Sequence, residues 1–193
     1  MKENITSCAF TGHRPKSFSF GYDESSPEFE ELRVRIKNTI IQVCNAGCRT
    51  FYCGMAEGAD LWCGEIVLEL KDRFDPPLEI CAVIPFLSQF SGMSEKNRVR
   101  YRKIMEASKR RYLVSRAFTD KCYQKRNYYL VDSSDALIAV YNEKIDETIN
   151  TDTSMRMILG KKLEDFVARE FCEQTGKKVR NLNGILRNDK YPF

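Results

Sequence analysis

Apolar and polar positions are arranged along the chain in blocks that predict alternating strands and helices. Extended runs of strand length occupy 4–10, 48–54, 78–86 and 135–142, with a shorter run at 111–115, and those at 78–86 and 135–142 are nearly continuously apolar. Such runs are typical of strands buried on both faces of a parallel sheet. Between them, apolar residues recur at spacings of three and four, as on one face of a helix. This order predicts an α/β fold, a single Rossmann-like domain with a mostly parallel sheet and helices on both faces.

Particular residues mark where helices begin and end. Ser26 precedes Pro27, so the serine can cap a helix whose first position suits proline. Gly47 is a typical stop signal for the same helix. Toward the carboxyl end, the pattern predicts a helix that ends at Gly176 and a closing edge strand over 177–182.

The size of the chain suits one domain over residues 1–193. A chain of 193 residues buries about 70% of its unfolded surface on folding, which is enough for a self-sufficient core. No apolar stretch has the length of a membrane span, and the first ten residues are too polar for a signal peptide. We therefore expect a cytoplasmic protein without a membrane partner. Domains of this kind often form homodimers, but the sequence does not specify an oligomeric state.

The eight cysteines indicate neither a disulfide framework nor a metal site. There is no C-x-x-C pair, and His13 is the one histidine available to complete a zinc site. Cys44 and Cys48 are four residues apart, but Gly47 interrupts the helix between them. We expect reduced thiols that pack as small apolar side chains, and no bound metal.

Positive charge is concentrated in one segment. Residues 94–111 hold eight Lys or Arg and two Glu, while the whole chain has a net charge of +4. Such a segment can bind nucleic acid or phosphates. The alternative is a solvated helix face with Tyr101, Ile104, Met105 and Ala107 turned inward. We favour this alternative because the segment lacks regularly interleaved aromatic residues.

The candidate chemistry lies in the loops that follow the strands, because ligands of open parallel sheets bind beyond the carboxyl ends of the strands. After the first strand comes "TGHRP", residues 11–15. Arg14 can bind a phosphate or carboxylate with two hydrogen bonds, and His13 can transfer a proton near neutral pH. Alternatively, Gly12 and Pro15 only shape a turn, and Arg14 pairs with a neighbouring acid.

The second strand leads into "GMAEGAD", residues 54–60, where small residues open a helix. Gly54 and Gly58 allow a phosphate or ribose to approach the backbone N–H groups at the positive end of the helix. Glu57 and Asp60 suit ribose hydroxyls or base nitrogens, or they cap the helix. The spacing matches neither the P-loop nor G-x-G-x-x-G.

Further along the chain, "YQKRNYYLVDSSD" precedes the strand that begins near Asp135. Arg126 can reach the strand ends as a cationic clamp, with Asn127 beside it. Asp132 and Asp135 are expected to cap or terminate elements, and for Asp135 we favour this structural role.

Taken in order, "TGHRP", "GMAEGAD", "VIPF" and "RNYYLVDSSDALIAVYN" resemble the YpsA-like members of the SLOG superfamily. This superfamily unites Rossmann-like domains related to the DNA-processing protein DprA and to the cytokinin-activating LOG enzymes. The resemblance implies a pocket for a nucleotide or nucleotide-derived ligand. In DprA-like proteins a similar small-residue turn is followed by Asp, which corresponds to Gly54, Gly58 and Asp60. Many SLOG proteins have a Gly-Gly-Thr or Gly-Thr turn before the last helix, but the corresponding segment "NTDTSMRMILGKK" has only Gly160 and no Thr after it. The LOG motif P-G-G-x-G-T-x-x-E is also absent, so LOG-type activity is not implied.

Three functional hypotheses follow. The first is binding, or sensing, of a nucleotide or an ADP-ribose-like ligand, without a firmly implied cofactor. The second is hydrolysis of an N-glycosidic or phosphoester bond in such a ligand, with His13, Glu57 or Asp60 as catalytic groups. The third is binding of single-stranded nucleic acid through residues 94–111. The residues expected to contact the ligand are Thr11, Gly12, His13, Arg14, Gly54, Ala56, Glu57, Gly58, Asp60, Pro85, Arg126 and Asn127.

Overall fold

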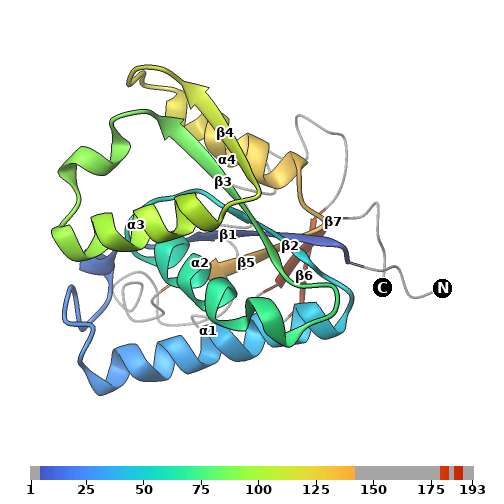
Figure 1. The fold of residues 1–193 in the computed structure, drawn as a ribbon. Helices are drawn as coiled ribbons and strands as arrows, with labels where there is room; N and C mark the ends of the chain where they lie inside the picture. Colours follow the sequence, from blue (N-terminus) through green and yellow to red (C-terminus); the bar gives the residue numbers. More distant parts are fainter. Residues whose placement is uncertain (1–4, 142–178, 183–184, 189–193) are drawn as a thin grey trace, which may run out of the picture.

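A computed structural model describes residues 5–141, 179–182 and 185–188, and its centre is a sheet of five parallel strands (Figure 1). Their spatial order is β4-β3-β2-β1-β5, and an antiparallel hairpin continues the sheet beyond β5 in the order β7-β6. The strands are β1 (Ser7–Gly12), β2 (Thr50–Cys53), β3 (Glu79–Phe86), β4 (Arg110–Ser115), β5 (Ala136–Val140), β6 (Val179–Leu182) and β7 (Ile185–Asn188). The predicted Rossmann-like α/β fold with a mostly parallel sheet is confirmed.

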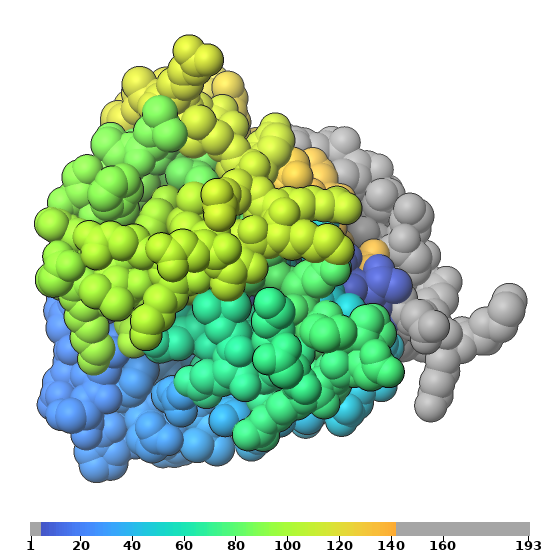
Figure 2. All heavy atoms as spheres, viewed as in Figure 1, coloured from blue at the N-terminus to red at the C-terminus, as the bar shows by residue number. Residues whose placement is uncertain are grey.

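Helices cover both faces of the sheet, as predicted. They are α1 (Pro27–Asn45), α2 (Ala59–Leu70), α3 (Glu95–Ala107) and α4 (Cys122–Asp132). Figure 2 shows α1, α2 and α3 side by side on one surface of the molecule. The fourth helix, α4, packs on the opposite face against β3 and β4. None of the described helices is long and apolar enough to cross a membrane.

The alternation of side chains along each strand divides the core into two parts. In β1, Cys8 and Phe10 belong to the main core under α1, α2 and α3, whereas Ala9 belongs to a smaller core under α4. Phe10 stacks on Phe51 of β2, with ring centroids 5.6 Å apart. Both faces of the strands are therefore apolar, which explains the continuous apolar runs in the sequence.

The helices begin and pack for local reasons that the sequence contains. The Ser26 hydroxyl accepts a hydrogen bond from the Phe29 amide at 3.1 Å, so the predicted cap of α1 is confirmed. In α2, a Cβ atom on Gly64 would lie 2.8 Å from Cδ1 of Ile104 in α3. This glycine therefore allows α2 and α3 to approach closely. With α1 on its other side, α2 is buried on nearly every face.

Two boundaries differ from the predictions. Strand β1 continues through Thr11 and Gly12, which were expected in a turn, because they pair with Ala139 and Val140 of β5. The edge strand expected over 177–182 is present as β6, but its partner β7 was not predicted. The helix expected to end at Gly176 lies outside the described residues.

The seven cysteines in the described part of the chain are free and buried. Burial raises the pKa of the Cys44 thiol to about 11, so it stays protonated at neutral pH. Within residues 5–141 and the described hairpin, no group of three or more His, Cys, Asp or Glu is placed to hold a metal ion.

Candidate functional site

The direction of strand order reverses between β1 and β5. The chain passes from β1 to β2, β3 and β4 on one side, and β5 then pairs with β1 on the other side. In open α/β sheets this topological switch point is where ligands bind, beyond the carboxyl ends of the strands. At this point Gly12 pairs with Val140, and the His13 amide donates to the Val140 carbonyl at 2.9 Å.

The start of α2 meets the end of β1 at the same place. A Cβ atom on Gly12 would lie 2.6 Å from the Cβ atom of Ala59. Gly58 has a φ of +88°, and a Cβ atom there would lie 2.7 Å from the His13 carbonyl oxygen and 3.2 Å from the Arg14 Cα atom. Residues 11–15 and the 54–60 bend are therefore in contact. The sequence placed both at strand ends, and the structure brings them together.

At Gly54 the space beside the backbone is filled by another part of the protein. A Cβ atom on Gly54 would lie 1.7 Å from Nη1 of Arg126. That nitrogen donates to Oδ2 of Asp60 at 2.7 Å, and both side chains are buried. The same Asp60 oxygen accepts from the Ala56 amide at 3.2 Å. The small residues and Asp60 thus hold a buried ion pair, which accounts for Gly54 without a ligand.

Met55 supports the same bend in an uncommon conformation. It is fully buried with a φ of +61°, in the left-handed region that non-glycine residues rarely adopt. Such backbone conformations persist where surrounding contacts hold them. The neighbouring Ala56 amide, fixed by Asp60, is one such contact.

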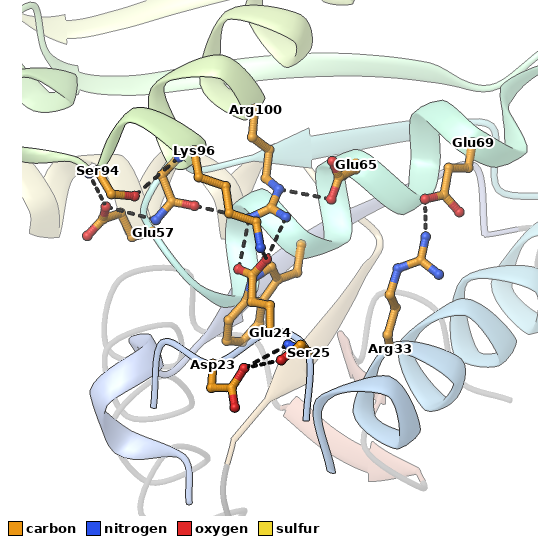
Figure 3. A network of polar contacts seen from close by, with 12 residues as sticks. Asp23, Glu24, Ser25, Arg33, Glu57, Glu65, Glu69, Ser94, Lys96 and Arg100 are labelled. Carbon is orange, nitrogen blue, oxygen red and sulfur yellow. Dashed lines mark hydrogen bonds and ion pairs between the residues drawn. The ribbon is translucent and has the colours of Figure 1, made fainter. Parts of the chain in front are cut away.

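Glu57 also has a protein partner. Its Oε1 atom accepts from Nδ2 of Asn97 at 2.9 Å and from the Ser94 amide at 3.3 Å (Figure 3). Ser94 caps α3, so Glu57 ties the bend before α2 to the start of α3. This contact stabilises the amino end of α3 through its dipole.

A polar network next to this contact was not predicted. Glu24, in the loop before α1, accepts from Nε1 of Trp62 at 2.7 Å and from Lys96 at 2.6 Å. It also accepts from Nη1 and Nη2 of Arg100 at 3.0 and 2.9 Å, and Arg100 donates to Glu65 at 2.9 Å. Figure 3 shows Lys96 and Arg100 extending from α3 toward Glu24. We call these five residues the Glu24 network.

Electrostatics in the Glu24 network favour the charged forms. Burial by itself raises the pKa of Glu24, but hydrogen bonds from Arg100, Lys96 and Trp62 outweigh burial and lower the pKa to about 2. Burial lowers the pKa of Arg100, but its carboxylate partners Glu24 and Glu65 outweigh burial and raise it. A single sequence gives little signal for this network, because Glu24 stands in a polar loop remote from α3.

The Glu24 network and its neighbours account for much of the charge in 94–111. Tyr101 and Ile104 are buried, and Met105 and Ala107 are partly buried, as the favoured interpretation of this segment expected. The carboxylate partners of its basic residues are Glu24 for Lys96 and Arg100, Glu65 for Arg100, Glu95 for Arg98 and Arg102, and Glu79 for Lys109.

Near the switch point, Arg14 has no carboxylate partner among the described residues. Within the described residues its guanidinium has no ion pair or hydrogen bond, and the residue is partly exposed. His13 is also partly exposed, with its ring centroid 6.1 Å from that of Phe18 and 6.4 Å from that of Tyr141. Tyr141 directly follows β5, so side chains from both strands of the switch point meet here.

The remaining predicted site residues lie in different settings. Thr11 is partly exposed within β1, and Pro85 is buried within β3. Asn127 is exposed on α4, although its neighbour Arg126 is buried. Among the described contacts, none links Pro85 or Asn127 to Arg14.

These features define a Rossmann-like protein whose strand-end loops meet at the switch point of a parallel sheet. A family model described as the YspA SLOG family (YpsA) matches residues 8–165, and the chain belongs to this family. The chain is 26% identical to a UPF0398 protein of Bacillus licheniformis over 141 residues, which cover 72% of this chain and 75% of that protein. It is 28% identical to UPF0398 proteins of Bacillus thuringiensis strain Al Hakam and Bacillus cereus strain AH187 over 144 residues, 70% of this chain and 74% of each relative. These names state no activity or ligand.

Proposed function

We propose that this protein binds a nucleotide or nucleotide-derived ligand, such as an ADP-ribose-like molecule, at the switch point between β1 and β5. The observation that carries the proposal is the position of Arg14. This arginine follows the end of β1, contacts the bend before α2, and has no carboxylate partner among the described residues. A guanidinium in this place suits a phosphate group, because it can donate two parallel hydrogen bonds to phosphate oxygens.

The bend before α2 supports the same ligand class. The amino end of a helix attracts anions through its dipole and its free N–H groups. The Ala56 and Ala59 amides donate to Asp60 and to the His13 carbonyl, at 3.2 and 3.4 Å. Within the described residues the Glu57 and Gly58 amides donate no hydrogen bond, so these amides are the ones proposed to meet the phosphate.

Partly exposed groups beside Arg14 would contact the rest of the ligand. The His13 ring and Tyr141 offer an aromatic surface and hydrogen-bonding groups of the kind that receive a base or ribose. Asp60 and Glu57 have a different part in this proposal. Because both bind protein groups, they shape the bend, and no observation favours them as catalytic acids or bases over this role.

Isothermal titration with AMP, ADP and ADP-ribose tests the proposal. At least one of them should bind, and Arg14→Ala should weaken it by about 10-fold to 100-fold, as expected for the loss of charge-assisted hydrogen bonds. Lys16→Ala is the matched control, because it removes one exposed positive charge two residues away. Absence of binding by the unmodified protein, or equal weakening by both variants, would contradict the proposal.

A further inference from the structure

Unpaired positive charge on the described surface is concentrated on β4 and α4, away from the switch point. Residues 109–130 contain seven Lys or Arg residues and one Asp. Within the described residues, only Lys109 and Arg126 of these seven have a carboxylate partner. Helix α3 differs, because four of its basic residues pair with Glu24, Glu65 or Glu95. Most of the positive charge on α3 is therefore neutralised by carboxylates. The basic residues of β4 and α4, apart from Arg126, have no carboxylate partner among the described residues.

Spacing and stacking align part of this charge in one strip. Lys121, Lys125 and Tyr129 follow one another at intervals of four residues, so they lie along one side of α4. The Tyr129 ring stacks on Tyr112 of β4, with centroids 3.8 Å apart and planes inclined by 10°. This side of α4 is thereby placed beside β4. Arg110 stands two residues before Tyr112, so both project from the same face of the sheet. We call these five residues the β4–α4 strip.

The β4–α4 strip is accessible and lies at the sheet edge. Arg110, Lys121 and Lys125 are exposed, and Tyr112 is 46% exposed although one ring face stacks on Tyr129. Strand β4 ends the sheet, with α4 packed against it (Figure 1). Six residues of strand span about 20 Å, which is the length of a few nucleotides.

Helix α4 begins with a positively charged residue, whereas negative charge is usual at the start of a helix. The first turns of α1, α2 and α3 contain acidic residues, as the helix dipole favours. The first turn of α4 contains none, and Lys121 is its capping residue. The positive end of the helix dipole therefore lies beside Lys121, and the nearest carboxylate in the sequence is that of Asp120, just before the helix.

Protection of the sheet edge explains only part of this pattern. Charged residues on an edge strand discourage pairing with other chains, and Arg110 can serve in this way. Lys121 and Lys125 are not on the strand, so edge protection does not account for them. Cations that flank an exposed stacked tyrosine match the elements by which proteins bind single strands, namely phosphate contacts and base stacking.

We infer that the β4–α4 strip binds single-stranded nucleic acid without base specificity. Arg110, Lys121 and Lys125 contact phosphates, and a base stacks on the Tyr112 and Tyr129 pair. This inference is independent of the ligand proposed for the switch point. Different variants test the two sites, so one can fail while the other holds.

Fluorescence anisotropy with labelled oligothymidine of about 20 nucleotides measures this binding. Three phosphate contacts give a slope of log affinity against log salt of about −2, or about a 20-fold loss of affinity between about 50 and 200 mM salt. Lys121→Ala/Lys125→Ala should reduce the slope to about −0.7, because one phosphate contact remains. Tyr112→Ala should weaken binding at least about fivefold, whereas Tyr112→Phe, which keeps the ring, should bind normally.

Arg35→Ala/Lys103→Ala is the matched control, since it removes two charges from exposed positions on α1 and α3. Circular dichroism melts establish that each variant is folded. If Tyr112→Ala does not fold, the salt dependence of the Lys121→Ala/Lys125→Ala variant tests the inference. The inference is overturned if oligothymidine does not bind at low salt, or if the control double variant weakens binding as much. Polyglutamate that competes as well as oligothymidine would also overturn it, because that result would indicate a site for acidic peptides.

Discussion

Glu24→Gln should destabilise the protein strongly, although Glu24 lies in a loop. The substitution keeps the size of the side chain but removes the charge that Arg100 and Lys96 share. Arg100 would retain Glu65 as a partner, but it would remain buried with one of its two carboxylate partners lost. A buried charge that loses a partner is costly, because the protein interior does not replace the missing solvation.

The lowered pKa of Glu24 sets the size of the effect. Its pKa falls from 4.5 to about 2 in the folded protein, and each pKa unit corresponds to about 1.4 kcal/mol. The carboxylate therefore contributes about 3 kcal/mol to the free energy of unfolding at neutral pH. For a chain of this length, the loss corresponds to a decrease in Tm of about 6 to 12 °C.

Urea unfolding followed by fluorescence is the direct assay. Trp62 is the one tryptophan in the chain, it is buried, and its indole nitrogen donates to Glu24. The pKa of Glu24 is lower in the folded than in the unfolded state, so the stabilisation is complete above about pH 4.5 and is lost as the pH falls toward 2. The difference in stability between the unmodified protein and Glu24→Gln should therefore narrow over that range.

Glu31→Gln is the control, because Glu31 is exposed on α1. It should change the stability by less than about 0.5 kcal/mol. A Glu24→Gln effect below about 1 kcal/mol at neutral pH would refute the reasoning, since it would place the network among weak surface ion pairs. The reasoning would also be refuted if the difference in stability between the unmodified protein and Glu24→Gln stayed constant from pH 5 down to the pKa of about 2.

Other predictions concern the supports of the site. Arg126→Met should lower the free energy of unfolding by about 3 to 5 kcal/mol because Asp60 is left buried and unpaired, and adding Asp60→Leu should restore part of it in chemical denaturation. Gly58→Ala should cost about 1 to 3 kcal/mol, measured as a lower Tm, because its φ is +88° and its Cβ atom would lie 2.7 Å from the His13 oxygen. Asp135→Ala should cost about 1 to 3 kcal/mol in urea unfolding, because it removes the acceptor of hydrogen bonds at the start of β1. Little change in any of these would contradict the corresponding contact.

The fold was accessible from the sequence because its signals are local. Apolar runs, the cap at Ser26 and the stop at Gly47 each depend on neighbouring residues, and the structure has the corresponding elements. The structural role favoured for Asp135 is also confirmed, since its Oδ2 atom accepts from the Thr6 and Ser7 amides at 3.0 and 3.1 Å. The ends of β1 differed from the prediction because pairing with β5 decides them.

The candidate site was predicted less completely. Residues 11–15 and 54–60 were expected at strand ends, and the structure brings them into contact. The partner of Arg126 was not predictable, because Asp60 is 66 residues away in the sequence. Glu24 and Arg100 are 76 residues apart, and no local pattern relates them.

The amino-acid sequence by itself determined the five parallel strands and the helices between them, and therefore that residues 11–15 and 54–60 stand at the carboxyl end of a parallel sheet. Only the tertiary structure decided which charges are neutralised. Ion pairs form between side chains that folding brings within a few ångströms, and their sequence separation carries no information about that distance. For this reason Asp60 and Arg126 pair with each other and four cations of α3 have carboxylate partners, whereas no such partner of Arg14 or of the cations in the β4–α4 strip lies among the described residues.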